Sequence, residues 1–464
     1  MEELSIKVND KIDVKIEDLN SEGYGVAKIN GYTLFVNNAM PGERCYVEII
    51  ELGKNFGFAK CLNVRDSSIY RIKPLCSNFG ECGGCDLMHV EYKAQLQYKK
   101  NKVIETIKRI GGVDNVVIDE IVGMENPYYY RNKVQMNFGY NPLTKKVVCG
   151  YYKKKTHSII QIDKCYLQDD NITDLLKFIK NICNELKITA YNETTHKGIL
   201  RHVLVRKNVN NDYMVVFVTN SFEFYKSEQL VEKIINRYPN VKSIYQNINL
   251  KQSNVILGEQ SHLLYGEKYL LEDLCGLKFN VSYKSFFQVN HDQTEKLYNL
   301  VLKYASSTGN KNIIDGYCGV GTISLLLSKQ FNHVYGIEVV SDAIKNAKAN
   351  AKLNDIKNVE FIVGKVEDVI ENYLRDKEVN TIVLDPPRKG LEKSVIHNII
   401  DSNIKNIIYV SCNVSTFARD FSIFKEHFNL KQISVVDMFP ETVDVECVAY
   451  LEKNKTIYSY RRKI

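Results

Sequence analysis

Short apolar runs alternate with helical stretches through residues 271–464, and the runs close on polar or glycine-rich turns. The expected strands occupy residues 312–315, 333–337, 359–363, 379–384 and 405–410. Strands that alternate with helices predict a parallel α/β sheet, and such sheets bind ligands where the carboxyl ends of their strands meet. We therefore expect residues 271–464 to form an α/β domain with a ligand site at that edge of the sheet.

Residues 1–66 show the pattern of a small β-barrel. Apolar residues recur from Val8 to Ile16, and two more strand-like segments flank the dipeptide Asn30-Gly31, which favours a tight hairpin turn. Barrels of this oligonucleotide-binding (OB-like) type can carry single-stranded nucleic acid on one face. A barrel without such a partner is the alternative.

The region between them, residues 67–270, combines helical and strand-like segments and predicts an α+β domain. Its strand-like runs include residues 199–219 and 241–258. Residues 90–110 have the spacing of a basic amphipathic helix, and a solvated charged face is the ordinary interpretation of such a pattern.

Two further segments of this region, 128–133 and 151–155, mix tyrosines with lysine or arginine. Bases can stack on such rings while the cations hold phosphates, so both segments are candidate RNA-binding surfaces. Polar strands of a mixed sheet are the alternative for each.

Three cysteines fall within ten residues: Cys76, Cys82 and Cys85, the last two separated by Gly-Gly. Thiolates grouped in this way bind zinc or an iron–sulfur cluster, and the spacing does not separate the two. A fourth ligand is needed. Cys165 is the first candidate and Cys149 is the alternative.

Length and charge narrow the class of protein. A chain of 464 residues is long enough for several domains, and its net charge of +7 suits a polyanionic partner. The first ten residues are polar and acidic, unlike a signal peptide, and no apolar run reaches the length of a membrane span. We expect a cytoplasmic protein with no membrane partner, whose twelve cysteines are reduced or metal-bound.

Candidate chemistry gathers at the ends of the expected strands. Cys412 follows the run 405–410, so its thiol should face the ligand crevice and act as a nucleophile rather than as a small packing residue. The turn after the first strand is rich in glycine, which lets a ligand approach the backbone. Glu338 ends the second strand and could accept ribose hydroxyls. The glycine spacing is not that of a nicotinamide dinucleotide site, which disfavours a dehydrogenase.

Five motifs occur in the order found in the RNA uracil-5-methyltransferases. They are Phe-Gln-Val-Asn (287–290), Asp-Gly-Tyr-Cys-Gly (315–319), Asp-Pro-Pro-Arg-Lys-Gly (385–390), Ser-Cys-Asn (411–413) and Pro-x-Thr-x3-Glu (440–446). With its cysteines and barrel, the chain resembles the iron–sulfur 23S ribosomal RNA (uracil-5-)-methyltransferases along essentially its whole length. The resemblance implies a multidomain protein: a TRAM domain at 1–66, an RNA-binding α+β domain with the iron–sulfur cluster at 67–270, and a Rossmann-like S-adenosylmethionine (SAM) methyltransferase domain at 271–464. It also implies that the helix around 90–125 packs with the last of these.

The resemblance further implies roles for individual residues. Cys412 would add to C6 of uracil, and Glu446 would then remove the proton from C5. SAM would be bound by Gln288, Tyr317, Glu338 and Asp385. A [4Fe-4S] cluster would be held by Cys76, Cys82, Cys85 and Cys165. The protein would act as a monomer on 23S ribosomal RNA, before or during assembly of the large ribosomal subunit.

Some positions depart from the family pattern, and two other functions stay open. Val414 replaces the usual proline, Thr322 a frequent asparagine and Asp444 the usual histidine near Glu446. Two carboxylates so close could raise one pKa. The alternatives are methylation of transfer RNA and a non-catalytic iron–sulfur RNA-binding or assembly protein. The cysteine set and the barrel speak against the first, because relatives that act on transfer RNA generally lack both. The intact Cys412 and Glu446 speak against the second.

Overall fold

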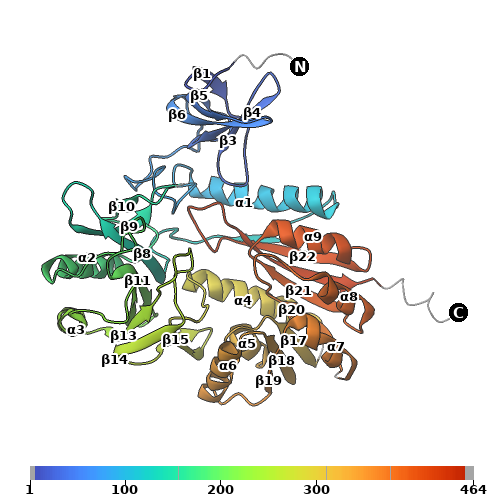
Figure 1. Ribbon diagram of the computed structural model, residues 1–464. Helices are drawn as coiled ribbons and strands as arrows, with labels where there is room; N and C mark the ends of the chain where they lie inside the picture. The colour runs from blue at the N-terminus through green and yellow to red at the C-terminus, as the bar shows by residue number, and fades with distance from the viewer. Residues whose placement is uncertain (1–5, 155, 310, 377, 455–464) are drawn as a thin grey trace.

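The computed structural model describes residues 6–154, 156–309, 311–376 and 378–454. The start of the acidic N-terminal segment and Lys155 of the second tyrosine–lysine segment lie outside the described residues. In the part of the chain that is described, no helix combines the length and apolarity needed to cross a membrane. Figure 1 shows a small barrel set on two larger bodies, each built of a sheet and helices.

The N-terminal domain is a β-barrel with strand order β1-β5-β6-β4-β3-β2. Its strands are β1 (Lys11–Lys15), β2 (Asp18–Leu19), β3 (Gly25–Ile29), β4 (Tyr32–Asn37), β5 (Arg44–Leu52) and β6 (Phe56–Asp66). Alternate side chains such as Leu34, Val36 and Val47 are fully buried in its core, as the two-residue period of a strand requires. Asn30 and Gly31 both take positive φ (47° and 84°) and form the expected hairpin turn.

A helical segment leads from the barrel along the C-terminal domain. It comprises α1 (Tyr92–Thr106) and the π-helical turn η1 (Ile107–Gly111), and it leads to β7 (Glu120–Val122). Val103 and Ile107 are fully buried in the core of the C-terminal domain, and β7 pairs in parallel with β22 (Phe428–Val436). The sequence pattern predicted that the charged face of α1 is solvated, and this prediction is wrong for Lys99. Lys99 is fully buried, where it forms an ion pair with Asp437.

The central domain is built on a sheet of order β10-β9-β8-β11-β12-β13-β14. Its elements are β8 (Lys133–Tyr140), β9 (Val147–Tyr152), β10 (Ile159–Gln161), α2 (Asp170–Glu185), β11 (Leu200–Lys207), β12 (Tyr213–Thr219), α3 (Ser227–Arg237), β13 (Val241–Ile248) and β14 (Gln260–Gly266). Both helices pack on one face, while Met214 and Val216 on the other face pack against β15 (Leu270–Leu274). Burial on both faces explains the continuous apolar runs. The strand expected over 241–258 ends at Ile248, because the Asn249 side chain donates to the carbonyls of residues 255 and 256 and closes a loop.

The C-terminal sheet has the order β19-β18-β17-β20-β21-β23-β22-β7. Its remaining strands are β17 (Asn312–Gly316), β18 (His333–Glu338), β19 (Val359–Val363), β20 (Val379–Leu384), β21 (Asn406–Ser411) and β23 (Glu446–Lys453), and β16 (Leu277–Val281) pairs with β15 beside it. The helices are α4 (His291–Ser306), α5 (Thr322–Leu327), α6 (Ser341–Leu353), α7 (Val366–Asp376), α8 (Lys393–Asp401) and α9 (Val414–Phe424). Strands β17 to β21 run parallel, and β23 is antiparallel to both of its neighbours. The strand order reverses between β17 and β20, and ligands bind open α/β sheets at such a switch point.

Candidate active site

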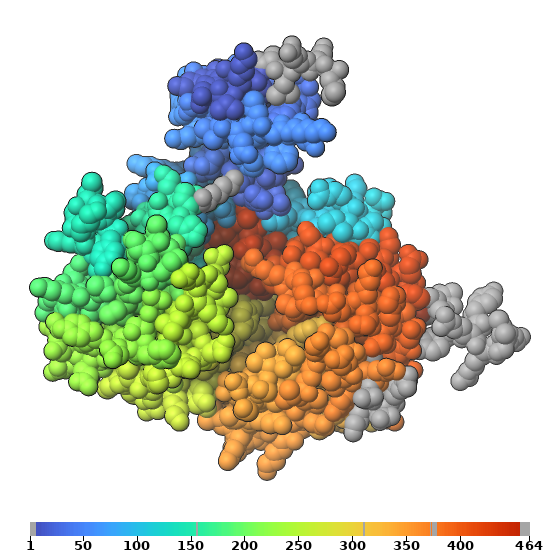
Figure 2. Space-filling view, in the orientation of Figure 1, coloured from blue at the N-terminus to red at the C-terminus, as the bar shows by residue number. Residues whose placement is uncertain are grey.

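A cavity of about 610 Å³ lies at the carboxyl ends of β17, β18 and β20. We call it the strand-end cavity. Its lining also includes residues of the central domain, and Figure 2 shows the surface hollowed between the two domains. Glu338 is part of this lining, and its carboxylate accepts hydrogen bonds from the amides of Gly319 (3.2 Å) and Val340 (2.8 Å). A carboxylate fixed at a strand end in this way can accept the hydroxyls of a ribose.

The residues expected to bind SAM divide between two places. Tyr317, Glu338 and Asp385 line the strand-end cavity. Gln288 is buried, and its backbone carbonyl accepts a hydrogen bond from Asn132 of the central domain (3.2 Å). Phe286 was missed by sequence reasoning: it lines the cavity and is 73% exposed. Its position directly before the Phe-Gln-Val-Asn motif (287–290) is the sequence signal that could have identified it.

Two carboxyl groups, Asp385 and Glu446, lie close together beside this cavity. Burial raises the pKa of Asp385 to about 7. Burial, followed by the nearby Asp385 and Asp444 carboxylates, raises the pKa of Glu446 to about 8. Glu446 Oε2 is buried and makes no hydrogen bond within the described part of the chain. A carboxyl group with a pKa near neutrality and a free oxygen atom is suited to proton transfer.

Cys412 lies between β21 and α9. The next residue, Asn413, caps the helix, because its side-chain oxygen accepts a hydrogen bond from the backbone amide of Ser415 (3.1 Å). Its partly buried thiol lines a second cavity of about 290 Å³, the thiol cavity, together with Arg388 and Asp444. Burial, and then the carboxylates of Glu446 and Asp385, raise the pKa of the thiol to about 11, while Arg388 opposes the shift. The thiol is therefore protonated at neutral pH and must lose its proton when it attacks.

The departures from the family pattern have visible consequences at two positions. Asp444 lies 3.4 Å from the Arg388 guanidinium, and its charge contributes to the raised pKa of Glu446. Thr322 begins α5, and its hydroxyl lies 3.3 Å from that of Tyr298, another residue that sequence reasoning missed. Tyr298 is close enough to Asp385 and Glu446 for their charges to raise its pKa, after the larger effect of burial.

The cysteines predicted to bind metal line one cavity of about 500 Å³, the cysteine cavity. They are Cys76, Cys82, Cys85 and Cys165. Burial raises the pKa values of the last three, and charges on neighbouring cysteines add to the effect. Cys149 lies elsewhere, buried against α2 with its sulfur 3.9 Å from a helix carbonyl. Across the described residues, no group of three or more His, Cys, Asp or Glu side chains has the arrangement of a metal-ion site.

Parts of both tyrosine–lysine segments are used inside the fold and do not form an open surface. Tyr130 is buried, and Arg131 and Tyr151 line the cysteine cavity. Lys154 forms an ion pair with Asp86 (2.9 Å). The interpretation of these segments as base-stacking surfaces is wrong for these residues, because their rings and charges are used inside the fold.

Known proteins and family models match this chain along nearly its whole length. Residues 91–454 match the family model described as tRNA (Uracil-5-)-methyltransferase, and residues 6–62 match the TRAM domain. An uncharacterized RNA methyltransferase of Bacillus cereus is 42% identical over 450 residues, 96% of this chain and 98% of the relative. One of Clostridium acetobutylicum is 43% identical over 456 residues, 97% and 98% of the two chains.

A solved structure shows the same architecture. It is the tRNA (uracil-54, C5)-methyltransferase of Pyrococcus abyssi in complex with S-adenosyl-L-homocysteine, with a TM-score of 0.76 and 27% identity, and the match covers 95% of this chain and all of that one. The resemblance found in the motifs is thereby confirmed at the level of the family, as are the barrel and the methyltransferase fold. The chain belongs to the (uracil-5-)-methyltransferase family of SAM-dependent RNA methyltransferases and carries an N-terminal TRAM domain.

Proposed function

We propose that the protein methylates C5 of a specific uridine in 23S ribosomal RNA, with Cys412 as covalent nucleophile and Glu446 as base. The observation that carries the proposal is that the partly exposed thiol of Cys412 and the buried Glu446 carboxyl group, whose pKa is raised, lie close enough to each other and to Asp385 of the strand-end cavity for their charges to interact. Uracil C5 is too weak a nucleophile to take a methyl group directly. Addition of a thiolate at C6 makes C5 enolate-like, which is covalent catalysis.

The two residues act at different steps. Cys412 gives up its proton to solvent as its sulfur forms a bond to C6, and the electrons of the C5–C6 double bond move to C5 and the adjoining carbonyl. Bound SAM would supply the electrophilic methyl group that C5 takes, and the bond between that methyl group and the SAM sulfur would break with its electron pair left on sulfur. Glu446 then accepts the remaining proton of C5, the C5–C6 double bond forms again, and the C6–S bond breaks. The sulfur leaves as thiolate and recovers a proton.

The strand-end cavity has the chemistry that SAM requires. Glu338 offers a fixed carboxylate to the ribose, and the backbone of Gly319 lies beside it. Tyr317 and Phe286 supply aromatic surface. Asp385 lines this cavity and lies near Glu446, so it could contact both the cofactor and the uracil edge. These contacts would bring the methyl group and the base together, which is the main contribution of positioning to such a reaction.

An aromatic surface on the barrel supports the binding of RNA. The rings of Tyr24, Phe35, Phe56 and Phe58 lie with centroids 5.4 to 5.8 Å apart, and Phe56 is 46% exposed. Strand pairing sets Phe35 beside Phe58 on the outer side of the barrel. We call this surface the barrel aromatic face. Half-exposed rings on such a barrel can stack on unpaired bases, and the target base itself must leave its stack to reach Cys412.

We also propose that Cys76, Cys82, Cys85 and Cys165 hold a [4Fe-4S] cluster. They share one cavity, and the cations of Lys154 and Arg131 favour their thiolates. In such a cluster each cysteine binds a different iron, so the sulfurs lie farther apart than those that share one zinc ion. Bound there, the cluster would link the loop before α1 to the segment after β10.

Transfer RNA is the second candidate substrate, and one observation favours it. The Pyrococcus abyssi enzyme, which is named for its transfer RNA substrate, matches 95% of this chain. The match therefore includes most of the barrel, and the presence of that domain does not separate the two targets.

Transcripts of 23S ribosomal RNA and of transfer RNA, incubated with methyl-labelled SAM, test the choice of substrate. Label in 5-methyluridine of the ribosomal transcript supports the proposal. Label in transfer RNA alone would mean that the substrate is transfer RNA and not 23S ribosomal RNA.

Denaturing gels test the mechanism. Glu446→Gln should accumulate an RNA–protein adduct that carries the methyl label, and the double variant with Cys412→Ala should form none. An adduct that persists in the double variant would rule out Cys412, and a protein that labels neither RNA would support the non-catalytic alternative.

A further inference from the structure

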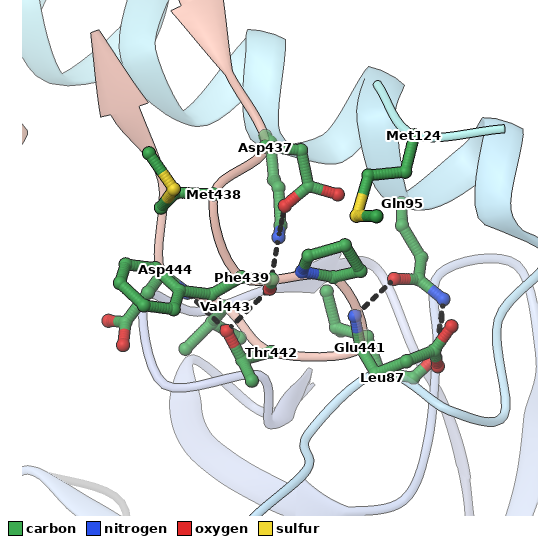
Figure 3. Close-up of polar contacts among 12 residues, drawn as sticks. Leu87, Gln95, Met124, Asp437, Met438, Phe439, Glu441, Thr442, Val443 and Asp444 are labelled. Atoms are coloured by element: carbon green, nitrogen blue, oxygen red, sulfur yellow. Dashed lines mark hydrogen bonds and ion pairs between the residues drawn. The ribbon is translucent and has the colours of Figure 1, made fainter. Parts of the chain in front are cut away.

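The loop that leads to Glu446 is held by a helix more than three hundred positions earlier in the chain. β22 ends at Val436 and β23 begins at Glu446, and we call the connection, together with the first residue of β23, the 437–446 loop. It lies across α1, as Figure 3 shows. Lys99 of α1 is fully buried, and its ammonium donates to Asp437 Oδ1 (2.5 Å) and to the carbonyl of Phe439 (2.9 Å).

A second contact lies one turn earlier on the helix. The amide oxygen of Gln95 accepts a hydrogen bond from the backbone N–H of Glu441 (3.1 Å), and its nitrogen donates to Glu441 Oε2 (3.2 Å). Figure 3 shows the side chains of Gln95 and Glu441 pointing toward one another between the helix and the loop. Gln95 and Glu441 are both buried, so these bonds form away from solvent. Such bonds are costly to leave unmade.

The loop is also held by the segment after Cys85, at a strained residue. Glu441 takes φ of 67°, which residues other than glycine rarely adopt. Its backbone carbonyl accepts hydrogen bonds from the backbone amides of Asp86 (2.9 Å) and Leu87 (3.0 Å), the two residues that follow Cys85. Strained backbone persists where its surroundings over-determine it. Beyond this turn, Asp444 enters the lining of the thiol cavity, two residues before Glu446.

Packing alone does not account for the buried ion pair. α1 already buries Val103 against the C-terminal core, and apolar side chains in place of a buried pair often stabilise a fold at least as well. A paired charge adds a fixed register between two segments, because its hydrogen bonds can be made in one alignment only. Tyr92 supports that alignment by donating to the other oxygen of Asp437 (2.8 Å).

We propose that Lys99 and Gln95 are positioning residues for Glu446, and that they fix the 437–446 loop so that the Glu446 carboxylate meets the C5 proton. The inference rests on the proposed function. Cys412 belongs to the turn between β21 and α9, outside these contacts. Loosening the loop should therefore slow removal of the C5 proton much more than addition of the thiol.

The test separates the two steps on the full-length protein with RNA and SAM. The steady-state rate of product release divided by the concentration of covalent adduct gives the rate constant for elimination, and rapid quenching gives that for adduct formation. Lys99→Met should slow elimination about ten- to a hundredfold, the effect of an ångström-scale misplacement, with adduct formation changed about twofold or less. Lys99→Arg, which keeps the charge, should recover part of the loss. Lys108→Met removes an exposed lysine from η1 and is the matched control.

A merely structural role gives a different result. Lys99→Met would then lower the amounts of adduct and of product in proportion to the folded fraction. The rate constant for elimination would stay that of the wild type, and that outcome overturns the proposal. If Lys99→Met does not fold, Gln95→Leu tests the second contact, and an unchanged elimination rate there also overturns it. Failure of the proposed function is distinct, since neither the wild type nor Glu446→Gln would then form adduct or methylated RNA.

Discussion

The ionisation of Glu446 should set the pH dependence of the last chemical step. Burial and the nearby Asp385 and Asp444 carboxylates raise the pKa of Glu446 to about 8, and only the ionised form can take the C5 proton. The ionised fraction is then about 0.1 at pH 7, about 0.5 at pH 8 and about 0.9 at pH 9. The rate constant for elimination should rise about fivefold from pH 7 to 8 and only about twofold from pH 8 to 9.

The rate of product release divided by the adduct concentration measures this constant at each pH. Ionisation of the Cys412 thiol, whose pKa is raised to about 11, affects adduct formation and drops out of the quotient. Asp444→Asn removes a neighbouring negative charge, so the inflection should move to lower pH. Glu446→Gln should slow elimination and abolish the inflection. An inflection near pH 8 that survives in Glu446→Gln, or an elimination rate that does not vary with pH, would refute the assignment of this carboxylate as the base.

The remaining predictions concern the cluster, the barrel and stability. Protein purified without oxygen should contain about four iron atoms per chain; Cys82→Ser should lose them and Cys149→Ser should keep them, whereas stoichiometric zinc without iron contradicts the cluster. Phe56→Ala combined with Phe58→Ala should weaken RNA binding about tenfold or more and leave its salt dependence unchanged, because the rings carry no charge; equal affinity in a binding titration would leave the barrel aromatic face without a role. Glu446→Gln should raise the melting temperature more at pH 9 than at pH 6. The native state holds the Glu446 proton more tightly than the unfolded chain, so the wild type loses stability as pH rises toward about 8, and a smaller gain at pH 9 would contradict this.

The sequence by itself determined the strands of the C-terminal sheet and the edge at which its chemistry lies. Parallel strands buried on both faces appear as continuous apolar runs, and such runs are visible in any single sequence. Because the carboxyl ends of parallel strands meet at one edge, residues that follow the runs must come together there. Tyr317, Glu338 and Asp385 line one cavity for this reason, and Cys412 lies beside them.

Only the tertiary structure decided which of the polar residues are buried. The local pattern of the lysines of α1 predicts a solvated face. Lys99 is nevertheless fully buried and paired with Asp437, a residue near the other end of the chain. The tyrosine–lysine segments likewise have the local pattern of an exposed RNA-binding surface. Only the tertiary structure shows that some of their residues, such as Arg131, line the cysteine cavity. Hydrophobic periodicity reports the face that a segment buries against its nearest layer. It carries no information about a charge partner hundreds of residues away, and for that reason the alignment of α1 with the loop that leads to Glu446 emerges only when the chain is folded.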